Sequence, residues 1–169
     1  SKGYICTGLI GSQWIMRELC KMGRADVAYL LASNDTYPSW GYMVKKGATT
    51  IWELWNGDTA GPKMNSKNHV MLLGDLIPFF YENMAGIKTD EKEAGFKKII
   101  MKPNFEIQDL SDVDASYMTP YGKVVSKWKK NLKHLDWNIT IPANATAIVY
   151  LPSDKSMIKE DGILVAKAK

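Results

Sequence analysis

The chain has 169 residues, which is enough for one domain of good size or for two small ones. Its 46% hydrophobic and 24% charged residues are ordinary for a globular protein, and no apolar stretch approaches the roughly 20 residues that span a membrane. The net charge of +4 is mild, and the densest lysine cluster, Lys127, Lys129 and Lys130, fits the solvated face of a strand. We therefore expect neither a nucleic acid partner nor a membrane span.

The cysteines and the first residues narrow the class of protein further. Cys6 and Cys20 have no other cysteine or histidine near them at the spacing of metal ligands, so a zinc site is not expected. We expect two free, buried thiols rather than a disulfide. The sequence contains no glycine-rich phosphate loop and no nucleophile elbow. The chain opens on Ser1 rather than Met and reads as internal sequence, so we expect a piece of a longer polypeptide.

The first 90 residues have the apolar spacing of helices. Helices are expected over residues 9–22, 26–32, 38–44 and 67–84. Gly23 and Gly47 follow the first and third of these as C-terminal caps, and Pro78 is expected to kink the fourth or delay its start. The fourth helix is apolar on most of its circumference, so it needs packing partners that this chain does not contain.

The period changes to that of strands after the polar stretch 86–95. Strands are expected over residues 96–101, 113–118, 123–128, 135–141 and 145–151. Short strands joined by turn residues indicate an antiparallel sandwich. The predicted fold is therefore α+β, with helices in residues 1–90 and a β-sandwich in residues 91–169. Alternation places Trp128 and Trp137 in the core of that sandwich.

Glu53 is the first candidate for catalysis, because Trp52 precedes it and Trp55 follows two residues later. General acid–base catalysis needs a carboxyl group with a tuned pKa, and flanking indoles would raise that pKa by partial desolvation. The alternative is a glutamate at the end of an element that lies among core tryptophans. His69 has the same two interpretations: a donor to a sugar hydroxyl or to a carboxylate, or a ring satisfied within a capping network. Trp40, with the other two indoles, suits stacking on sugars, although core packing is commoner.

Several segments, taken in order, resemble the C-terminal part of bacterial α-L-rhamnosidases of glycoside hydrolase family 78. They lie at residues 7–11, 23–29, 37–42, 47–53 and 66–69. The most distinctive are Tyr-Pro-Ser-Trp-Gly at 37–41 and Ala-Thr-Thr-Ile-Trp-Glu at 48–53. The resemblance is specific through His69 and weaker in the all-β region, which is similar to the C-terminal β-sandwich of that family.

This resemblance implies the end of an (α/α)6 catalytic barrel and an inverting mechanism. In that mechanism one acid protonates the glycosidic oxygen, and a second carboxylate activates a water on the opposite face of the sugar. The resemblance assigns the general base to Glu53 and contact with rhamnose to His69, and it places Trp40, Trp52 and Trp55 around the pocket. The general acid of the family lies upstream of the matching segments. We therefore expect a fragment that is inactive alone.

The expected partners are a rhamnose-containing carbohydrate substrate and the missing N-terminal part of the same polypeptide. The resemblance implies no metal or organic cofactor, and it favours a periplasmic or secreted location. Two alternatives stay open: another glycosidase with an (α/α)6 barrel, and a non-catalytic β-sandwich that binds carbohydrate through Trp128, Trp137 or Tyr121.

Overall fold

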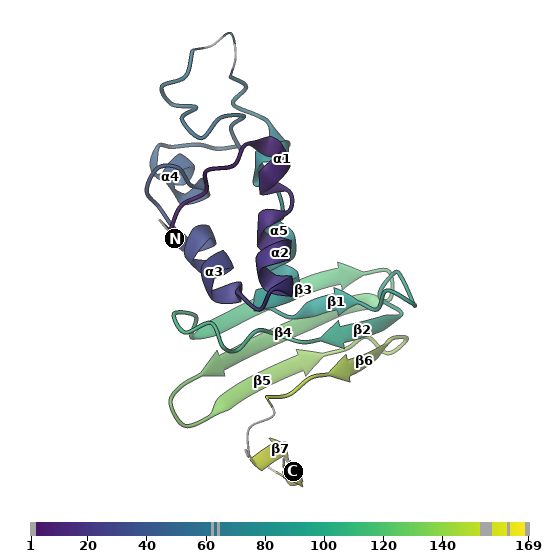
Figure 1. Cartoon of the computed structure of the whole chain (residues 1–169). Coiled ribbons are helices and arrows are strands. Elements are labelled where there is room, and N and C mark those ends of the chain that lie inside the picture. Colours follow the sequence, from purple (N-terminus) through teal and green to yellow (C-terminus); the bar gives the residue numbers. More distant parts are fainter. Residues whose placement is uncertain (1–2, 62, 64, 153–156, 162, 168–169) are drawn as a thin grey trace.

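The computed structural model describes residues 3–61, 63, 65–152, 157–161 and 163–167. Helices and loops from the N-terminal half form one part of the molecule, and a β-sandwich forms the other (Figure 1). This order confirms the predicted α+β fold of helices followed by a sandwich. None of the described helices is both long enough and apolar enough to cross a membrane.

The helical part consists of short elements. They are α1 (Leu9–Ser12), α2 (Ile15–Lys21), α3 (Ala25–Ser33), α4 (Trp40–Lys45), the 3-10 helix η2 (Val70–Leu73), α5 (Leu76–Pro78) and the π-helix η3 (Phe79–Met84). The prediction of one helix over 9–22 is wrong at its middle, because Gln13 and Trp14 separate α1 from α2. The prediction for 67–84 is wrong in its first half, because the helical turns begin only at Val70 and break again at Gly74.

A serine N-cap and the predicted glycine cap explain where α4 begins and ends. The Ser39 hydroxyl accepts a hydrogen bond from the backbone N–H of Tyr42, which satisfies a donor that the first turn leaves unpaired. Gly47 adopts a φ of 80° just after the helix, as a left-handed C-terminal cap requires. The helix is thereby fixed at both ends, and its inner side buries Trp40 and Met43.

Gly74 breaks the predicted fourth helix for a steric reason. Its φ is 58°, and a Cβ at this position would lie 2.0 Å from the carbonyl oxygen of Ser12. The backbone of η2 and α5 thus passes directly against the end of α1, where no side chain fits.

We expect Gly74→Ala to lower the free energy of unfolding by about 3 kcal/mol, since a left-handed alanine and an immovable backbone clash add together. Gly23→Ala is the matched control, because Gly23 has a φ of 73° with no atom within 4 Å of the added Cβ, and it should lose only about 1 kcal/mol. Urea unfolding of both variants measures the difference. Equal losses in the two variants would contradict this explanation.

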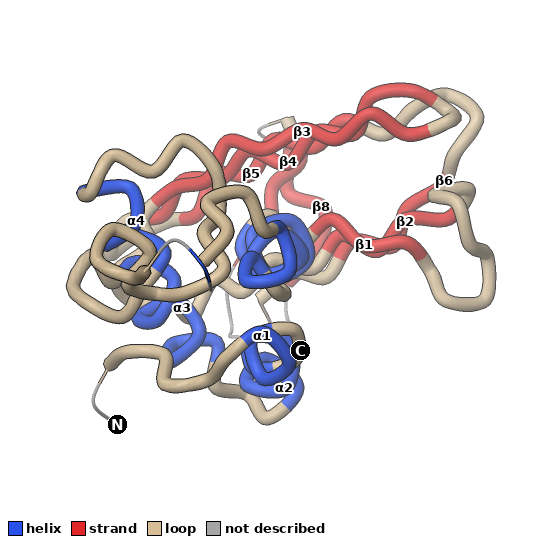
Figure 2. Tube along the Cα trace, turned by 90° about the horizontal axis from the view of Figure 1, so that it is seen from above, coloured by secondary structure: helices blue, strands red, loops and turns tan. Residues whose placement is uncertain are grey.

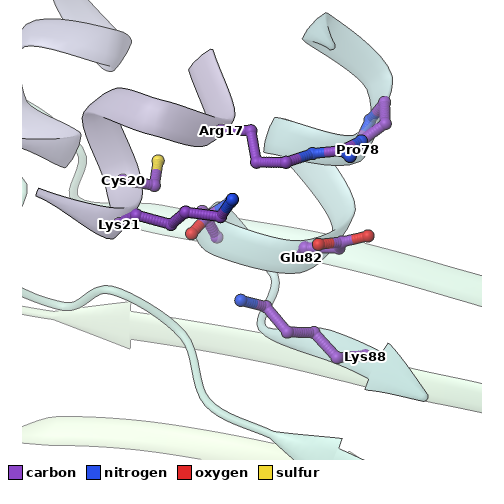
Figure 3. Close-up of a pocket in the computed structure, with 7 residues that line it drawn as sticks. Arg17, Cys20, Lys21, Pro78, Glu82 and Lys88 are labelled. Atoms are coloured by element: carbon purple, nitrogen blue, oxygen red, sulfur yellow. The ribbon is translucent and has the colours of Figure 1, made fainter. Parts of the chain in front are cut away.

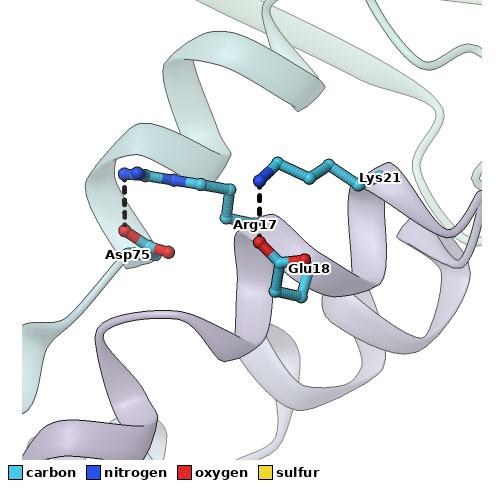
Figure 4. A network of polar contacts seen from close by, with 4 residues as sticks. All are labelled: Arg17, Glu18, Lys21 and Asp75. Carbon is cyan, nitrogen blue, oxygen red and sulfur yellow. Dashed lines mark hydrogen bonds and ion pairs between the residues drawn. The ribbon is translucent and has the colours of Figure 1, made fainter.

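Two ion pairs lie near that break, and one of them joins two helices (Figure 4). Arg17 of α2 contacts Asp75, just before α5, with 3.0 Å between Nη2 and Oδ1, and Asp75 is only 5% exposed. Lys21 contacts Glu18 within α2 at 2.8 Å, and both of those side chains are exposed. The first pair links two helices through a buried carboxylate, whereas the second contributes little to stability.

The strands form three sheets, one of which lies apart near the C-terminus. They are β1 (Ile87–Thr89), β2 (Lys98–Met101), β3 (Asp112–Thr119), β4 (Gly122–Lys130), β5 (Leu135–Thr140), β6 (Thr146–Val149), β7 (Met157–Glu160) and β8 (Ile163–Lys167). The sheet orders are β1-β2-β6, β3-β4-β5 and β7-β8. All five predicted strands are present, whereas β1, β7 and β8 had no counterpart among the predictions. The pairs are antiparallel except β2–β6, which is parallel and starts with Lys98 opposite Thr146.

The first two sheets face one another as the layers of the sandwich (Figure 2). Ile99 and Met101 of β2 and Val124 of β4 are each fully buried between them. Apolar side chains of β3 and β5 complete this core, as alternation along antiparallel strands requires.

Trp128 joins the sandwich to the helices. It is 1% exposed, and its indole Nε1 donates a hydrogen bond to the carbonyl oxygen of Met84 at 2.9 Å. The ring of Phe105 lies edge-on to Trp128 and to Trp137, with 5.3 Å between centroids in each case. The predicted core position of Trp128 is confirmed, and Trp137 is half-buried beside it. A buried Trp128 offers no ring face for a sugar.

Candidate functional site

The segments that carry Glu53 and His69 run side by side. The backbone N–H of Glu53 donates to the carbonyl oxygen of Ser66 at 2.8 Å, and the N–H of His69 donates to that of Ile51 at 2.7 Å. The hydroxyl of Thr50 adds a bond to the carbonyl of Lys67. Residues 50–53 and 66–69 therefore form a short ladder of hydrogen bonds. This ladder places Glu53 and His69 on adjacent segments of the chain.

The Glu53 side chain is fixed by the segment opposite. It is half-buried, and its Oε2 accepts a hydrogen bond from the backbone N–H of Ser66 at 2.8 Å. Among the described residues, none donates a hydrogen bond to its second oxygen, Oε1. Glu53 thus meets Ser66 through both its backbone and its carboxylate. A carboxylate oriented by one oxygen keeps the other available as a proton acceptor.

His69 carries an unsatisfied ring nitrogen. The ring is half-buried, and its Nδ1 is buried without a hydrogen-bond partner among the residues that the structure describes. His69 precedes η2, but its side chain makes no capping bond there. The interpretation of a ring satisfied within its own capping network is therefore wrong. Buried polar atoms without partners are uncommon in folded proteins, so His69 is a candidate for a functional role.

The three indoles pack in the core next to the ladder. Trp40 and Trp52 are each 4% exposed, and the Nε1 of Trp40 donates to the carbonyl oxygen of Leu72 at 2.8 Å. Trp55 is half-buried, lies edge-on to Trp40 with 5.5 Å between centroids, and donates to the carbonyl oxygen of Thr7 at 2.8 Å. In this chain the rings of Trp40 and Trp52 are core residues, and Trp55 alone of the three keeps appreciable exposure.

The sequence analysis did not single out Asp58, which lies in the loop after Glu53. Its Oδ2 accepts a hydrogen bond from the Tyr42 hydroxyl at 2.8 Å and lies 3.8 Å from the Nζ of Lys46. The hydrogen bond to Asp58, together with partial burial, raises the pKa of Tyr42. The Oδ1 of Asp58 and the Oδ1 of Asn65 are buried and have no partner among the described residues. No signal in the sequence pairs Tyr42 with a residue sixteen positions later.

Comparison with known proteins shows which family the chain resembles. Residues 1–84 match the model of the bacterial α-L-rhamnosidase six-hairpin glycosidase domain, and residues 86–163 match that of the bacterial α-L-rhamnosidase C-terminal domain. The chain belongs to the bacterial α-L-rhamnosidase family. The model that its helical residues match describes a six-hairpin glycosidase domain.

Similar proteins extend far beyond the length of this chain. An α-L-rhamnosidase of Formosa agariphila is 36% identical over 158 residues, which are 90% of this chain and 17% of that protein. One from Streptomyces avermitilis is 32% identical over 156 residues, or 89% and 15%. This rhamnosidase-family chain therefore spans less than a fifth of the length of these relatives.

Solved structures of α-L-rhamnosidases are similar in fold to this chain. The crystal structure of Streptomyces avermitilis α-L-rhamnosidase complexed with L-rhamnose superposes on 96% of this chain with a TM-score of 0.81 and 29% identity, and the chain covers 17% of it. The α-L-rhamnosidase structure from Dictyoglumus thermophilum covers 96% with a TM-score of 0.85 and 33% identity, and the chain covers 18% of it.

The hollows next to α2 contain none of the candidate residues of this rhamnosidase-family chain. A cavity of about 130 Å³ lies between α2, η3 and β1, and includes Cys20 and Lys88 (Figure 3). A groove of about 420 Å³ continues from it along the junction with the sandwich. Among the described residues, no group of three or more His, Cys, Asp and Glu side chains is placed to hold a metal ion.

The two thiols of this rhamnosidase-family chain differ in exposure. Both are free, as predicted, but the expectation that both are buried is wrong for Cys6, which is exposed. The neighbouring side chain of Ile5 is buried in the core, whereas that of Cys6 lies on the surface. Cys20 faces the cavity, and burial raises the pKa of its thiol to about 11.

We expect iodoacetamide at pH 8 to modify Cys6 readily and Cys20 very slowly. The thiolate is the reactive form, and a pKa of about 11 leaves only about 10⁻³ of Cys20 ionised at pH 8. The alkylation rate of Cys20 should rise about tenfold for each pH unit until the pH approaches that pKa. Mass spectrometry of the tryptic peptides measures both rates, and equal labelling at pH 8 would contradict the burial of Cys20.

Proposed function

We propose that this chain is part of an inverting α-L-rhamnosidase in which Glu53 is the general base and His69 contacts the sugar. One observation carries the proposal: the Ser66 N–H holds one oxygen of Glu53, on a ladder that also carries the unsatisfied ring of His69. The relative from Streptomyces avermitilis that is complexed with L-rhamnose supports rhamnose as the sugar.

The chemistry assigned to Glu53 is removal of a proton from water. In an inverting glycosidase the base and the acid stand about 6.5–9.5 Å apart, with the water and the anomeric carbon between them. The free Oε1 of Glu53 would accept that proton while Oε2 stays bonded to Ser66. The half-buried ring of His69 would form a hydrogen bond with a sugar hydroxyl.

We further propose that the general acid lies in a part of the polypeptide outside this chain. The lengths of the relatives support this, because the chain covers 17% of one and 15% of another. We place the boundary between the catalytic helices and the C-terminal sandwich next to Gly86, since η3 ends at Met84 and β1 begins at Ile87. The missing upstream part is thus the partner that completes the site.

The pure 169-residue chain is expected to release no rhamnose from an aryl α-L-rhamnoside, whereas the full-length protein should release it. Half of a catalytic pair gives no concerted proton transfer. Circular dichroism of the isolated chain serves as the control for folding. Rhamnose release by the isolated chain that Glu53→Gln abolishes would contradict the incomplete site. Faster hydrolysis of glucosides than of rhamnosides by the full-length protein would favour another glycosidase.

A further inference from the structure

The loop between the two site segments returns to its own starting point. It leaves the ladder after Glu53, projects from the helical part on the side away from the sandwich, and rejoins the ladder at Ser66 (Figure 1). The side chain of Asn65 closes its base by donating from Nδ2 to the carbonyl oxygen of Gly57 at 3.0 Å. The position of the Glu53 carboxylate therefore depends on where this loop is held.

At Gly57 the backbone of the loop packs directly against the indole of Trp52. A Cβ on Gly57 would lie 2.7 Å from ring atoms of Trp52, so the glycine backbone rests directly on that ring. Trp52 is buried with Met43 and Leu72 in one cluster, which leaves its ring no room to move aside. The contact at Gly57 thus fixes the distance between the loop backbone and the Trp52 ring.

The next residue, Asp58, ties the loop sideways to α4. The Tyr42 hydroxyl donates to its Oδ2 at 2.8 Å, and the Nζ of Lys46 lies 3.8 Å from the same oxygen. The Asp58 side chain is only 18% exposed, so water competes weakly for this bond. Because Ser39 caps α4 and Met43 anchors it in the core, the helix is a rigid reference for the loop.

We propose that Tyr42 and Asp58 are positioning residues that hold the Glu53 loop, and with it the Glu53 carboxylate, in register with Ser66. Neither residue reaches the reacting atoms in this role. The proposal rests on the proposed function of Glu53 as the general base.

Tyr42→Phe in the full-length protein tests this role, since it keeps the ring and removes only the hydroxyl. We expect kcat on an aryl rhamnoside to fall about 10–100-fold, with KM changed less than about twofold, as a displaced catalytic group implies. Asp58→Ala should cause a similar fall, and the double variant should be no worse than either single one. Asp58→Asn retains an acceptor for the hydroxyl and should keep kcat within about threefold of wild type. Tyr29→Phe, which loses a 3.4 Å bond to Asp109 elsewhere, is the matched control.

A second measurement on the 169-residue chain does not depend on activity. In Tyr42→Phe, hydrogen exchange at the amides of Ser66 and His69 should speed up at least tenfold, because both amides bond across the ladder. Unchanged exchange together with wild-type kcat would overturn the positioning role. So would a raised KM with unchanged kcat.

The two proposals fail in different ways. If Glu53→Gln leaves full-length activity intact, the proposed function is wrong whatever Tyr42→Phe does. If Glu53→Gln abolishes activity and Tyr42→Phe changes neither kcat nor amide exchange, only the positioning role is wrong.

A matched pair of glycine variants probes the same loop. Gly57→Ala should lower kcat as Tyr42→Phe does, since its Cβ meets the Trp52 ring, whereas Gly61→Ala adds a Cβ with no atom within 4 Å and should change nothing. Equal activity in the two glycine variants would count against control of Glu53 by the loop.

Discussion

Glu53→Gln is expected to lower kcat of the full-length protein on α-L-rhamnosides by about 10²–10⁴-fold, the usual contribution of a general base. Glutamine keeps the size of the side chain, and its amide oxygen still accepts the hydrogen bond from Ser66. It cannot take a proton from water at neutral pH. The loss should therefore appear in kcat, with the melting temperature within about 2 °C of wild type.

The control for this change is Glu91→Gln, which neutralises an exposed glutamate on the turn between β1 and β2. It should keep both kcat and the melting temperature of wild type. A kcat for Glu53→Gln within threefold of this control would contradict a catalytic role for Glu53. A large fall in melting temperature for Glu53→Gln alone would indicate that its bond to Ser66 serves mainly the fold.

Trp128→Ala is expected to lower the free energy of unfolding of the chain by about 3–5 kcal/mol. The ring is 1% exposed, so its removal leaves a cavity where β4 meets the helices. The change also strips the carbonyl oxygen of Met84 of its 2.9 Å hydrogen bond and Phe105 of its edge-on partner. Small domains are stable by only about 5–15 kcal/mol, so this variant should be close to unfolding at 37 °C.

Two other variants separate the parts of that loss. Trp128→Phe keeps an aromatic ring without the N–H and should lose about half as much as Trp128→Ala, from the hydrogen bond and the smaller volume. Trp14→Ala is the control on the surface, because Trp14 is 52% exposed and lies beside Arg17; it should lose less than about 1 kcal/mol. Urea denaturation followed by far-UV circular dichroism measures all three. A loss for Trp128→Ala no larger than for Trp14→Ala would contradict a junction held by Trp128.

Local signals in the sequence were enough to predict elements with strong caps and strict alternation. α4 has Ser39 before it and Gly47 after it, and the structure shows both in their capping roles. The alternation in β4 and β5 was equally clear. These features depend on neighbours within a few residues, which a sequence displays directly.

Features set by distant contacts could not be predicted. Gly74 ends η2 because the backbone of Ser12 lies against it, 62 positions earlier in the chain. β1 is three residues long at the edge of a polar stretch, and the parallel β2–β6 pair depends on segments almost fifty residues apart. Tertiary packing decided each of these against the local pattern.

Some features of the candidate site could be predicted from local sequence, and others could not. Glu53 and His69 were found through ordered motifs, and the ladder between their segments is a finding of the structure. Trp40 and Trp52 show the limit of an aromatic pattern, because indoles that pack in a core and indoles that stack on sugars have the same spacing. Nothing in the sequence pointed to Asp58, since its partner Tyr42 is on another element.

The role of Glu53 as base rather than acid is tested most directly by varying the leaving group. Full-length wild type and Glu53→Gln would be compared on 2,4-dinitrophenyl and methyl α-L-rhamnosides. A general base acts on water in both reactions, so the fold loss in kcat/KM should be of similar size for the two substrates. Near wild-type activity of Glu53→Gln on the dinitrophenyl substrate alone would contradict the assignment, because an acidic leaving group dispenses with the acid and not with the base.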